Sequence, residues 1–155
     1  MGRVSRGSLD SGKEDRHMNV RRVFLGGLIA GIVYFFGDGL VHGLLLKQQW
    51  AAILGANTQQ TMHSPAYYLP YDLLKGWAVV WIYAAIRPRF GPGPKTAVLA
   101  GFAGWLLAIP VPLLGLLPMN FFGAQFVALW SIYGLFPMIV GALVGGWIYR
   151  EDGGV

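Results

Sequence analysis

Four long apolar runs constrain this chain more than any other feature of its sequence. They cover approximately residues 23–46, 66–86, 96–117 and 121–149. A helix needs roughly 20 residues to cross a hydrocarbon core about 30 Å thick, so each run is long enough to span it. Only 12% of the 155 residues are charged, too few to cover the surface of a soluble domain. The sequence therefore predicts an all-α, integral membrane four-transmembrane-helix bundle over residues 21–150.

The positions of the basic residues predict the orientation of this bundle. Six of the twelve Lys and Arg lie in the first 22 residues, and three more lie between the second and third runs. Arg150 follows the fourth run, whereas the loop 47–65 contains only Lys47. Because basic loops stay in the cytoplasm, both termini are predicted to be cytoplasmic (N-in/C-in). Residues 1–20 are predicted to form a disordered basic tail that suits anionic lipid headgroups better than nucleic acid.

Three charged residues lie inside the apolar runs, namely Asp38, Asp72 and Lys75. Helical rise places Asp38 about 22 Å from the cytoplasmic edge, with Asp72 and Lys75 about 21 and 16 Å from it. A lone charge at such depth costs several kcal/mol, so partners are expected. We predict that Lys75 joins both aspartates and links the first two helices. A structural salt bridge is the favoured interpretation, and a proton or ion relay that continues through His42 is the alternative.

His42 is the one histidine inside an apolar run, because His17 and His63 lie in the tail and a loop. A single histidine can be an axial ligand to chlorophyll magnesium, whereas haem held by two histidines of this chain is excluded. A hydrogen-bonded histidine at a helix interface, near Asp38, is the favoured interpretation. Apart from this pigment hypothesis, no metal and no cofactor other than bound lipid is predicted.

Small residues recur four apart in the first and fourth runs, a spacing that lets two helix backbones approach closely. The pairs are Gly27/Gly31, Gly39/Gly43 and Gly141/Gly145. The first pair shares a helical face with Phe35, Asp38 and His42. Gly39 lies eight residues after Gly31, which turns it by about 80°. We therefore expect at least one glycine face to contact another chain, a cofactor or a lipid.

The loops also carry signals. Arg87–Lys95 contains three prolines and two glycines, and we expect no helix there. Trp50, Ile53 and Leu54 have helical spacing, which predicts a short helix lying on the membrane interface. Aromatic residues near the ends of the runs predict interfacial belts, with Tyr67, Tyr68 and Tyr71 outside and Trp147 and Tyr149 inside.

Catalytic motifs are missing from the sequence. It has no cysteine, no zinc signature, no serine-nucleophile elbow, no acidic pair with glycosidase spacing, and no convincing internal repeat of the kind found in transporters. We therefore expect no enzyme. The favoured function is a non-catalytic accessory subunit that packs into a larger membrane complex, such as a photosynthetic or respiratory assembly. The alternative is a small homo-oligomeric transporter or channel that uses Asp38, Asp72 and Lys75.

Two segments, Met18–Gly31 and Leu44–Ala52, resemble small uncharacterised bacterial four-helix inner-membrane proteins. The resemblance lies in the glycine spacing of the first helix and in Trp50 after a polar break. It implies a multi-pass protein of the bacterial inner (cytoplasmic) membrane, and it assigns no activity or site residue.

Reporter fusions test the predicted orientation. A reporter after Val155 or near Gly91 should report the cytoplasm, and one near Asn57 should report the outside, because ten basic residues lie on one side and one on the other. Alkaline phosphatase and green fluorescent protein fusions provide the measurement. A cytoplasmic loop 47–65 would invert the topology.

Overall fold

The structure is a computed structural model, and it describes residues 18–55 and 64–150. This part of the chain is almost entirely helical and contains no strand. Its elements, in chain order, are α1 (Val20–Leu40), the π-helix η1 (Val41–Leu45), α2 (Lys47–Leu54), the 3-10 helix η3 (Pro65–Tyr68), α4 (Leu69–Phe90), α5 (Pro94–Ala108), α6 (Pro110–Leu116), the 3-10 helix η4 (Leu117–Met119) and α7 (Ala124–Ile148). Most of the predicted tail 1–20 lies outside the described residues.

Three helical stretches in the described residues are long and apolar enough to cross a membrane. They are Val20–Leu45, Pro94–Met119 and Ala124–Ile148. The remaining long helix, α4, has 22 residues but carries Asp72 and Lys75 and ends with two arginines. These lengths and compositions are those of a multi-pass membrane protein.

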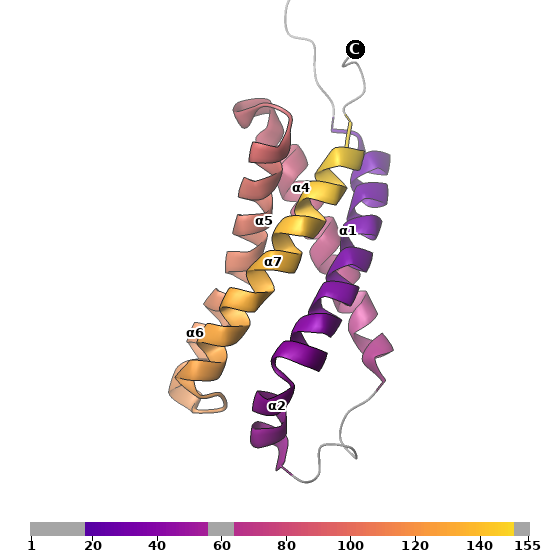
Figure 1. The fold of residues 1–155 in the computed structure, drawn as a ribbon. Coiled ribbons are helices and arrows are strands. Elements are labelled where there is room, and N and C mark those ends of the chain that lie inside the picture. The colour runs from indigo at the N-terminus through magenta and orange to yellow at the C-terminus, as the bar shows by residue number, and fades with distance from the viewer. Residues whose placement is uncertain (1–17, 56–63, 151–155) are drawn as a thin grey trace, which may run out of the picture.

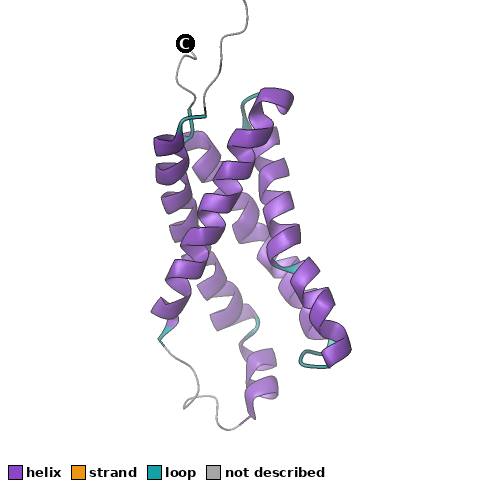
Figure 2. Ribbon diagram, turned by 180° about the vertical axis from the view of Figure 1, so that it is seen from behind, coloured by secondary structure: helices purple, strands orange, loops and turns teal. Residues whose placement is uncertain are grey.

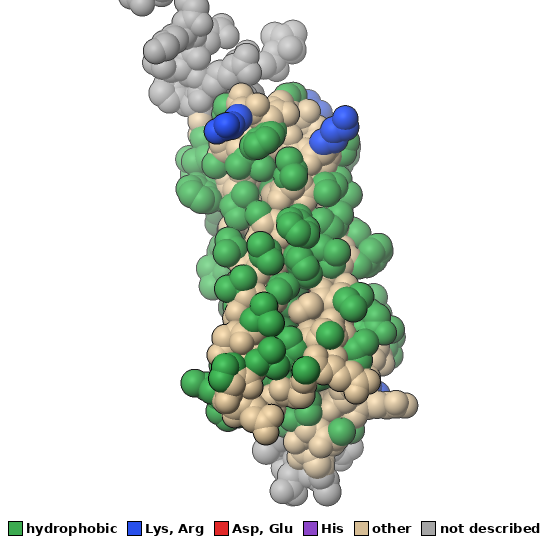
Figure 3. All heavy atoms as spheres, turned by 90° about the vertical axis from the view of Figure 1, so that its left-hand side faces the viewer, with side chains coloured by type: hydrophobic (Ala, Val, Ile, Leu, Met, Phe, Trp, Pro, Cys, Tyr) green, Lys and Arg blue, Asp and Glu red, His purple; other side chains and the backbone are tan. Residues whose placement is uncertain are grey.

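The helices form one elongated bundle. α1, α4, α7 and the rod made of α5 and α6 lie alongside one another (Figure 1). The ends of α1 and α7 that lead to the termini share one end of the bundle with the α4–α5 connection, and α2 and η4 lie at the other end (Figures 1 and 2). Hydrophobic side chains cover most of the face in Figure 3, whereas Lys and Arg gather mainly at the end near the termini. This distribution matches an apolar band with basic residues at one edge.

The connection between α4 and α5 is shorter than the sequence predicts. The expectation that Arg87–Lys95 is not helical was wrong at both ends, because α4 continues to Phe90 and α5 begins at Pro94. Pro94 occupies the first turn of α5, where its missing N–H breaks no helical bond. Gly91 ends α4 at φ 82°, and its N–H donates to the Arg87 carbonyl at 2.8 Å. Thr96 Oγ1 donates to the Gly91 carbonyl at 2.7 Å and fixes the turn.

The third and fourth rods also depart from uniform helices. Helix breaks at Ile109, at φ −121° and ψ −73°, because proline at position 110 disfavours helical geometry in the residue before it. α7 begins at Ala124 rather than at Phe121 and continues through Pro137. The predicted belt residue Tyr149 is buried and packs its ring against Tyr83 at 5.9 Å, whereas Trp147 is 80% exposed.

Glycines set the distances between the helices. A Cβ atom built on Gly76 of α4 would overlap the backbone of Gly27 and Gly31 of α1, so these two helices touch through their main chains. A Cβ on Gly141 of α7 would overlap the ring of Tyr34. Tyr34 is fully buried and donates its hydroxyl to the Met138 carbonyl at 3.2 Å. α1 is therefore locked between α4 and α7.

Substitution of Gly76 tests this backbone contact. Gly76→Ala should destabilise the bundle by about 1–3 kcal/mol, because the methyl group has no space between α4 and α1. Thermal unfolding in detergent provides the measurement. Gly115→Ala in α6 is the matched control, since a Cβ there meets nothing within 4 Å. Equal melting temperatures for the two variants would contradict the contact.

Candidate functional site

Asp38, Asp72 and Lys75 form one group of contacting side chains, called here the charge triad. Lys75 Nζ lies 2.8 Å from Asp72 Oδ1, and it also donates to Asp38 Oδ2 across the α1–α4 contact. The side chains of Lys75 and Asp72 are 6% and 2% exposed, and that of Asp38 is 18% exposed. The structure thus has the pairing that the sequence predicts, with one ammonium between two carboxylates.

Aromatic rings complete the surroundings of Lys75. Its Nζ lies 4.8 Å from the centre of the Tyr71 ring and 5.5 Å from that of Tyr34. A cation over an aromatic face is stabilised by the ring quadrupole, more so where water is excluded. The ammonium is therefore held by two carboxylates and two rings, and its position depends on both α1 and α4.

The triad has one more acid than it has bases. Asp72 Oδ2 is buried, and no donor in the described residues reaches it. A buried acceptor without a partner loses its hydration without compensation, which costs about 1–3 kcal/mol. With both aspartates ionised, the triad would also carry a net charge of −1. The triad is therefore a structural link between helices that leaves one acid group unbalanced.

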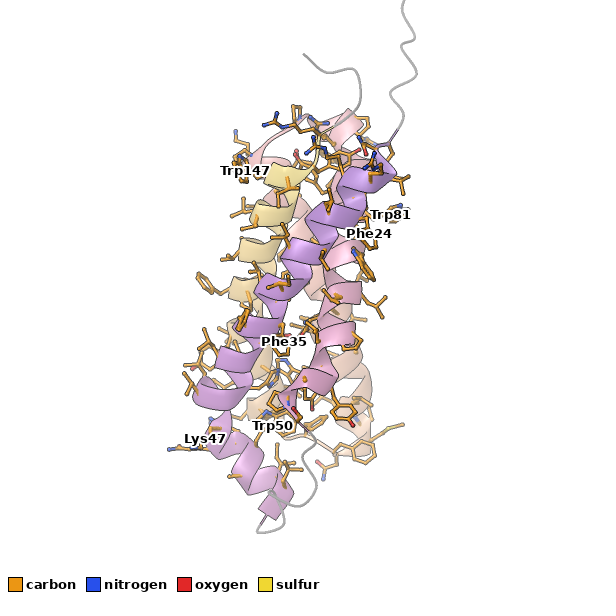
Figure 4. All side chains as sticks on the ribbon, turned by 90° about the vertical axis from the view of Figure 1, so that its right-hand side faces the viewer. Phe24, Phe35, Lys47, Trp50, Trp81 and Trp147 are labelled. Carbon is orange, nitrogen blue, oxygen red and sulfur yellow. The ribbon has the colours of Figure 1, made fainter. Side chains whose placement is uncertain are left out.

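His42 lies in a separate cluster of rings, the aromatic cluster (His42, Trp50, Phe122, Phe126 and Trp130). Trp50 reaches it from α2, and its Nε1 donates to His42 Nδ1 at 3.1 Å. The edge of the Trp130 ring meets the imidazole, with the ring centres 4.8 Å apart. Trp50 lies at the end of the bundle opposite Trp147 (Figure 4). In the described residues, no hydrogen bond joins His42 to Asp38.

This geometry favours an interface histidine over a pigment ligand. An indole N–H can only donate, so Nδ1 is the acceptor and the proton of a neutral imidazole is on Nε2. Metal-bound histidines show the opposite pattern, because they donate the proton of their second nitrogen and bind metal through the bare one. Among the described residues, no group of three or more His, Cys, Asp or Glu could hold a metal ion.

The glycine pairs separate into packed and open positions. Gly27 packs on Trp77, Gly31 on Leu73, and Gly145 on Val80. A Cβ on Gly39 or Gly43, in contrast, would meet nothing within 4 Å. Gly39 and Gly43 are therefore the glycine pair of the first helix that the other described helices leave uncovered. The eight-residue offset between Gly31 and Gly39 turns the second pair away from α4.

A shallow apolar groove opens between α1 and α4 near the end that carries the termini. Its volume is about 360 Å³, and it is lined by Val20, Val23, Phe24, Trp77, Ala78 and Trp81. Phe24 and Trp81 lie close together there (Figure 4). Trp77 Nε1 donates to the Phe24 carbonyl at 3.1 Å and fixes one wall. The groove offers contact to hydrocarbon and no polar chemistry.

Sequence reasoning missed the residues that surround the triad and His42. Phe122, just before α7, and Phe126 and Trp130 within it are spaced four apart, and this spacing could have predicted one aromatic stripe at the start of α7. Tyr34 carried no such signal, because its contact with Gly141 joins residues that are far apart in the chain. Tyr71 lies four residues before Lys75, a helical spacing that could have predicted their contact, whereas its position near the end of an apolar run predicts only a place in the outer aromatic belt.

Comparisons with models of protein families, with curated proteins and with solved structures found no match. The charge triad, the aromatic cluster and the open glycines are thus the features from which a function can be inferred.

Substitution of Lys75 tests the triad. Lys75→Ala should destabilise the bundle by about 3–5 kcal/mol, because two buried carboxylates lose their counter-charge. Adding Asp38→Asn should recover part of this loss. Unfolding in detergent gives the free energies, with Lys47→Ala on the exposed surface of α2 as the control. A neutral Lys75→Ala would show that the triad does not support the fold.

Proposed function

We propose that this chain is a four-span protein of the bacterial inner (cytoplasmic) membrane, with both termini in the cytoplasm. Its proposed role is that of a non-catalytic accessory subunit that packs against other chains of a larger membrane complex, respiratory and photosynthetic assemblies included.

The position of α4 supports a fourth span. α4 runs antiparallel to α1 in main-chain contact, with Gly76 against Gly27 and Gly31. A helix of 22 residues is about 33 Å long, enough to cross the hydrocarbon core. Its two inner charges pair with each other and with Asp38, which lowers the cost of placing them in lipid. If α1 crosses the membrane, α4 has the length and the pairing to cross beside it.

The observation that carries the proposed role is the open glycine face of α1 and η1. A Cβ on Gly39 or Gly43 would meet nothing within 4 Å in the described part of the chain, although every other glycine within α1 packs against a neighbouring helix. The flanking side chains of Phe36, Leu40 and Leu44 are 65%, 59% and 69% exposed. Contact with lipid requires no small residues at this position, whereas a second helix can approach closely only where side chains are small. This face therefore fits a helix of another chain.

The local helix geometry adds a second argument. Val41–Leu45 is π-helical, and Leu46 donates its N–H to the Val41 carbonyl at 2.8 Å. Single π-turns are rare and occur frequently at functional sites. Here the π-turn includes Gly43 and changes the direction in which the residues after Gly39 point. The widened backbone lies on the same surface that we assign to a partner.

The inward placement of the polar groups supports a non-catalytic role. The triad is buried between α1 and α4, and His42 is occupied by Trp50 and Trp130. The groove at the other end is lined by apolar side chains alone. No described surface thus presents a nucleophile and a base together to a substrate.

A small homo-oligomeric transporter or channel is the second candidate, and the unequal charge of the triad favours it. Asp38, Asp72 and Lys75 bring two acids and one base together, and Asp38 retains some exposure. A transported cation could be bound at such a site. In this case the open glycine face would join copies of the same chain.

Native electrophoresis tests the accessory role. Membranes solubilised in mild detergent should show the chain in a large complex, and the double variant Gly39→Leu/Gly43→Leu should release it, because leucine fills the open face without touching the chain's own core. Gly115→Leu is the control, since it occupies open space in α6 at the same end of the bundle. A monomeric wild type would exclude the role, and a homo-oligomer would favour the second candidate.

A further inference from the structure

We propose that the charge triad binds one exchangeable proton at Oδ2 of Asp72, and that this proton exchanges on the side of the triad where Asp38 lies. The inference goes beyond the accessory role and does not depend on it.

The first argument is the count of charges. Two carboxylates face one ammonium, and the other groups near them supply no second cation. Tyr34 and Tyr71 present rings to Lys75, and His42 accepts a hydrogen bond from Trp50. The described residues of α6 and α7 carry no charge, and the only charged residue of α5, Lys95, lies in its first turn at the other end. One positive charge is therefore missing.

The second argument is the unsatisfied oxygen of Asp72. Oδ2 is buried and has no donor in the described part of the chain, while Oδ1 lies against Lys75. Asp38 and Asp72 lie against the same ammonium, so the two carboxylates are close neighbours. Two carboxylates held this close disfavour a second negative charge, and we assign the proton to Asp72, whose Oδ2 is buried without a donor in the described residues. This proton would supply the missing donor and make the triad neutral.

A proton fits this place better than a metal cation. Hard cations such as Mg²⁺ and Ca²⁺ take six or more oxygen ligands. The triad offers four carboxylate oxygens, and Lys75 already contacts one from each aspartate. A proton needs only one free carboxylate oxygen, and Asp72 Oδ2 supplies it. The exchange is a simple association, in which Asp72 Oδ2 takes a proton from a hydronium ion, a water molecule is left, and the carboxylate becomes a neutral acid.

Burial around the triad gives the direction of exchange. Asp38 is the most exposed of its three side chains, and it lies one helical turn before the π-turn. Towards the termini the core is closed by Tyr34, Ala30 and Val80, each of them fully buried. The Tyr34 hydroxyl is engaged by the Met138 carbonyl. Asp38 is therefore the most accessible member of the triad, and the closed core towards the termini opposes a relay through the whole bundle.

Infrared spectroscopy of the full chain in lipid vesicles tests the proposal. Asp38 and Asp72 are the only acids in the described residues, because the other five of the seven lie within residues 1–17 and 151–155. At neutral pH the wild type should show the carbonyl stretch of a protonated carboxylic acid, shifted by ¹³C-aspartate and by deuterium oxide. Asp72→Asn should abolish this band, because the remaining carboxylate then pairs with Lys75.

Three comparisons decide the outcome. Lys47→Met should keep the band, as a control for the loss of a lysine outside the triad. If Asp72→Asn does not fold, the isotope shift of the wild-type band still decides the question. A wild type without the band at neutral pH, or a band that persists in both Asp72→Asn and Asp38→Asn, would overturn the proposal. Loss of the wild-type band on addition of sodium chloride would do so too, since it would assign the site to a metal cation.

Discussion

Charges do not remain unpaired in a hydrocarbon environment, and the rest of this structure depends on how that constraint is met. Lys75 lies between Asp38 of α1 and Asp72 of its own helix. The charge of Asp38 is therefore paired only when α1 and α4 are in contact. The pairing needs a short distance between the two axes. Gly27, Gly31 and Gly76 provide it, because their backbones touch where side chains would separate the helices. The ion pairs and the glycines are thus two parts of one interface.

The contact between α1 and α4 determines where α7 and α5 can pack. Once α1 and α4 are in contact, Tyr34 projects from α1 into the gap opposite Gly141 and determines how closely α7 can approach. Trp105 of α5 then donates to the Ser131 carbonyl of α7 at 2.8 Å and joins the last two rods. These contacts of α7 with α1 and α5 consist of apolar packing and of single hydrogen bonds to carbonyls, without an ion pair. α7 can therefore lack charged residues, and α5 can carry only Lys95 in its first turn, without losing their places in the bundle.

The sequence was sufficient to predict the helices and the triad but not the details around them. Run length and composition located all four rods, and the pairing of Lys75 with both aspartates followed from depth and helical spacing. The continuation of α4 through Pro88 was missed, because packing tolerates one absent hydrogen bond in a final turn. The position of Tyr34 could not be predicted, nor could the choice of Gly39 and Gly43 as the open pair, since both depend on how α1 turns between two neighbours. The number of spans and the orientation remain predictions.

The polarity of α4 has a consequence for how the protein enters the membrane. A translocon that tested α4 alone would meet Asp72 and Lys75, each of which costs about 2.5–3.5 kcal/mol near the centre of a helix. α1 is more apolar and leaves the ribosome first, but its Asp38 then lacks a counter-charge until Lys75 arrives. In the proposed four-span arrangement, α1 would therefore wait at the lateral gate and partition into lipid together with α4. α1 and α4 would be inserted as one hairpin rather than as two successive helices.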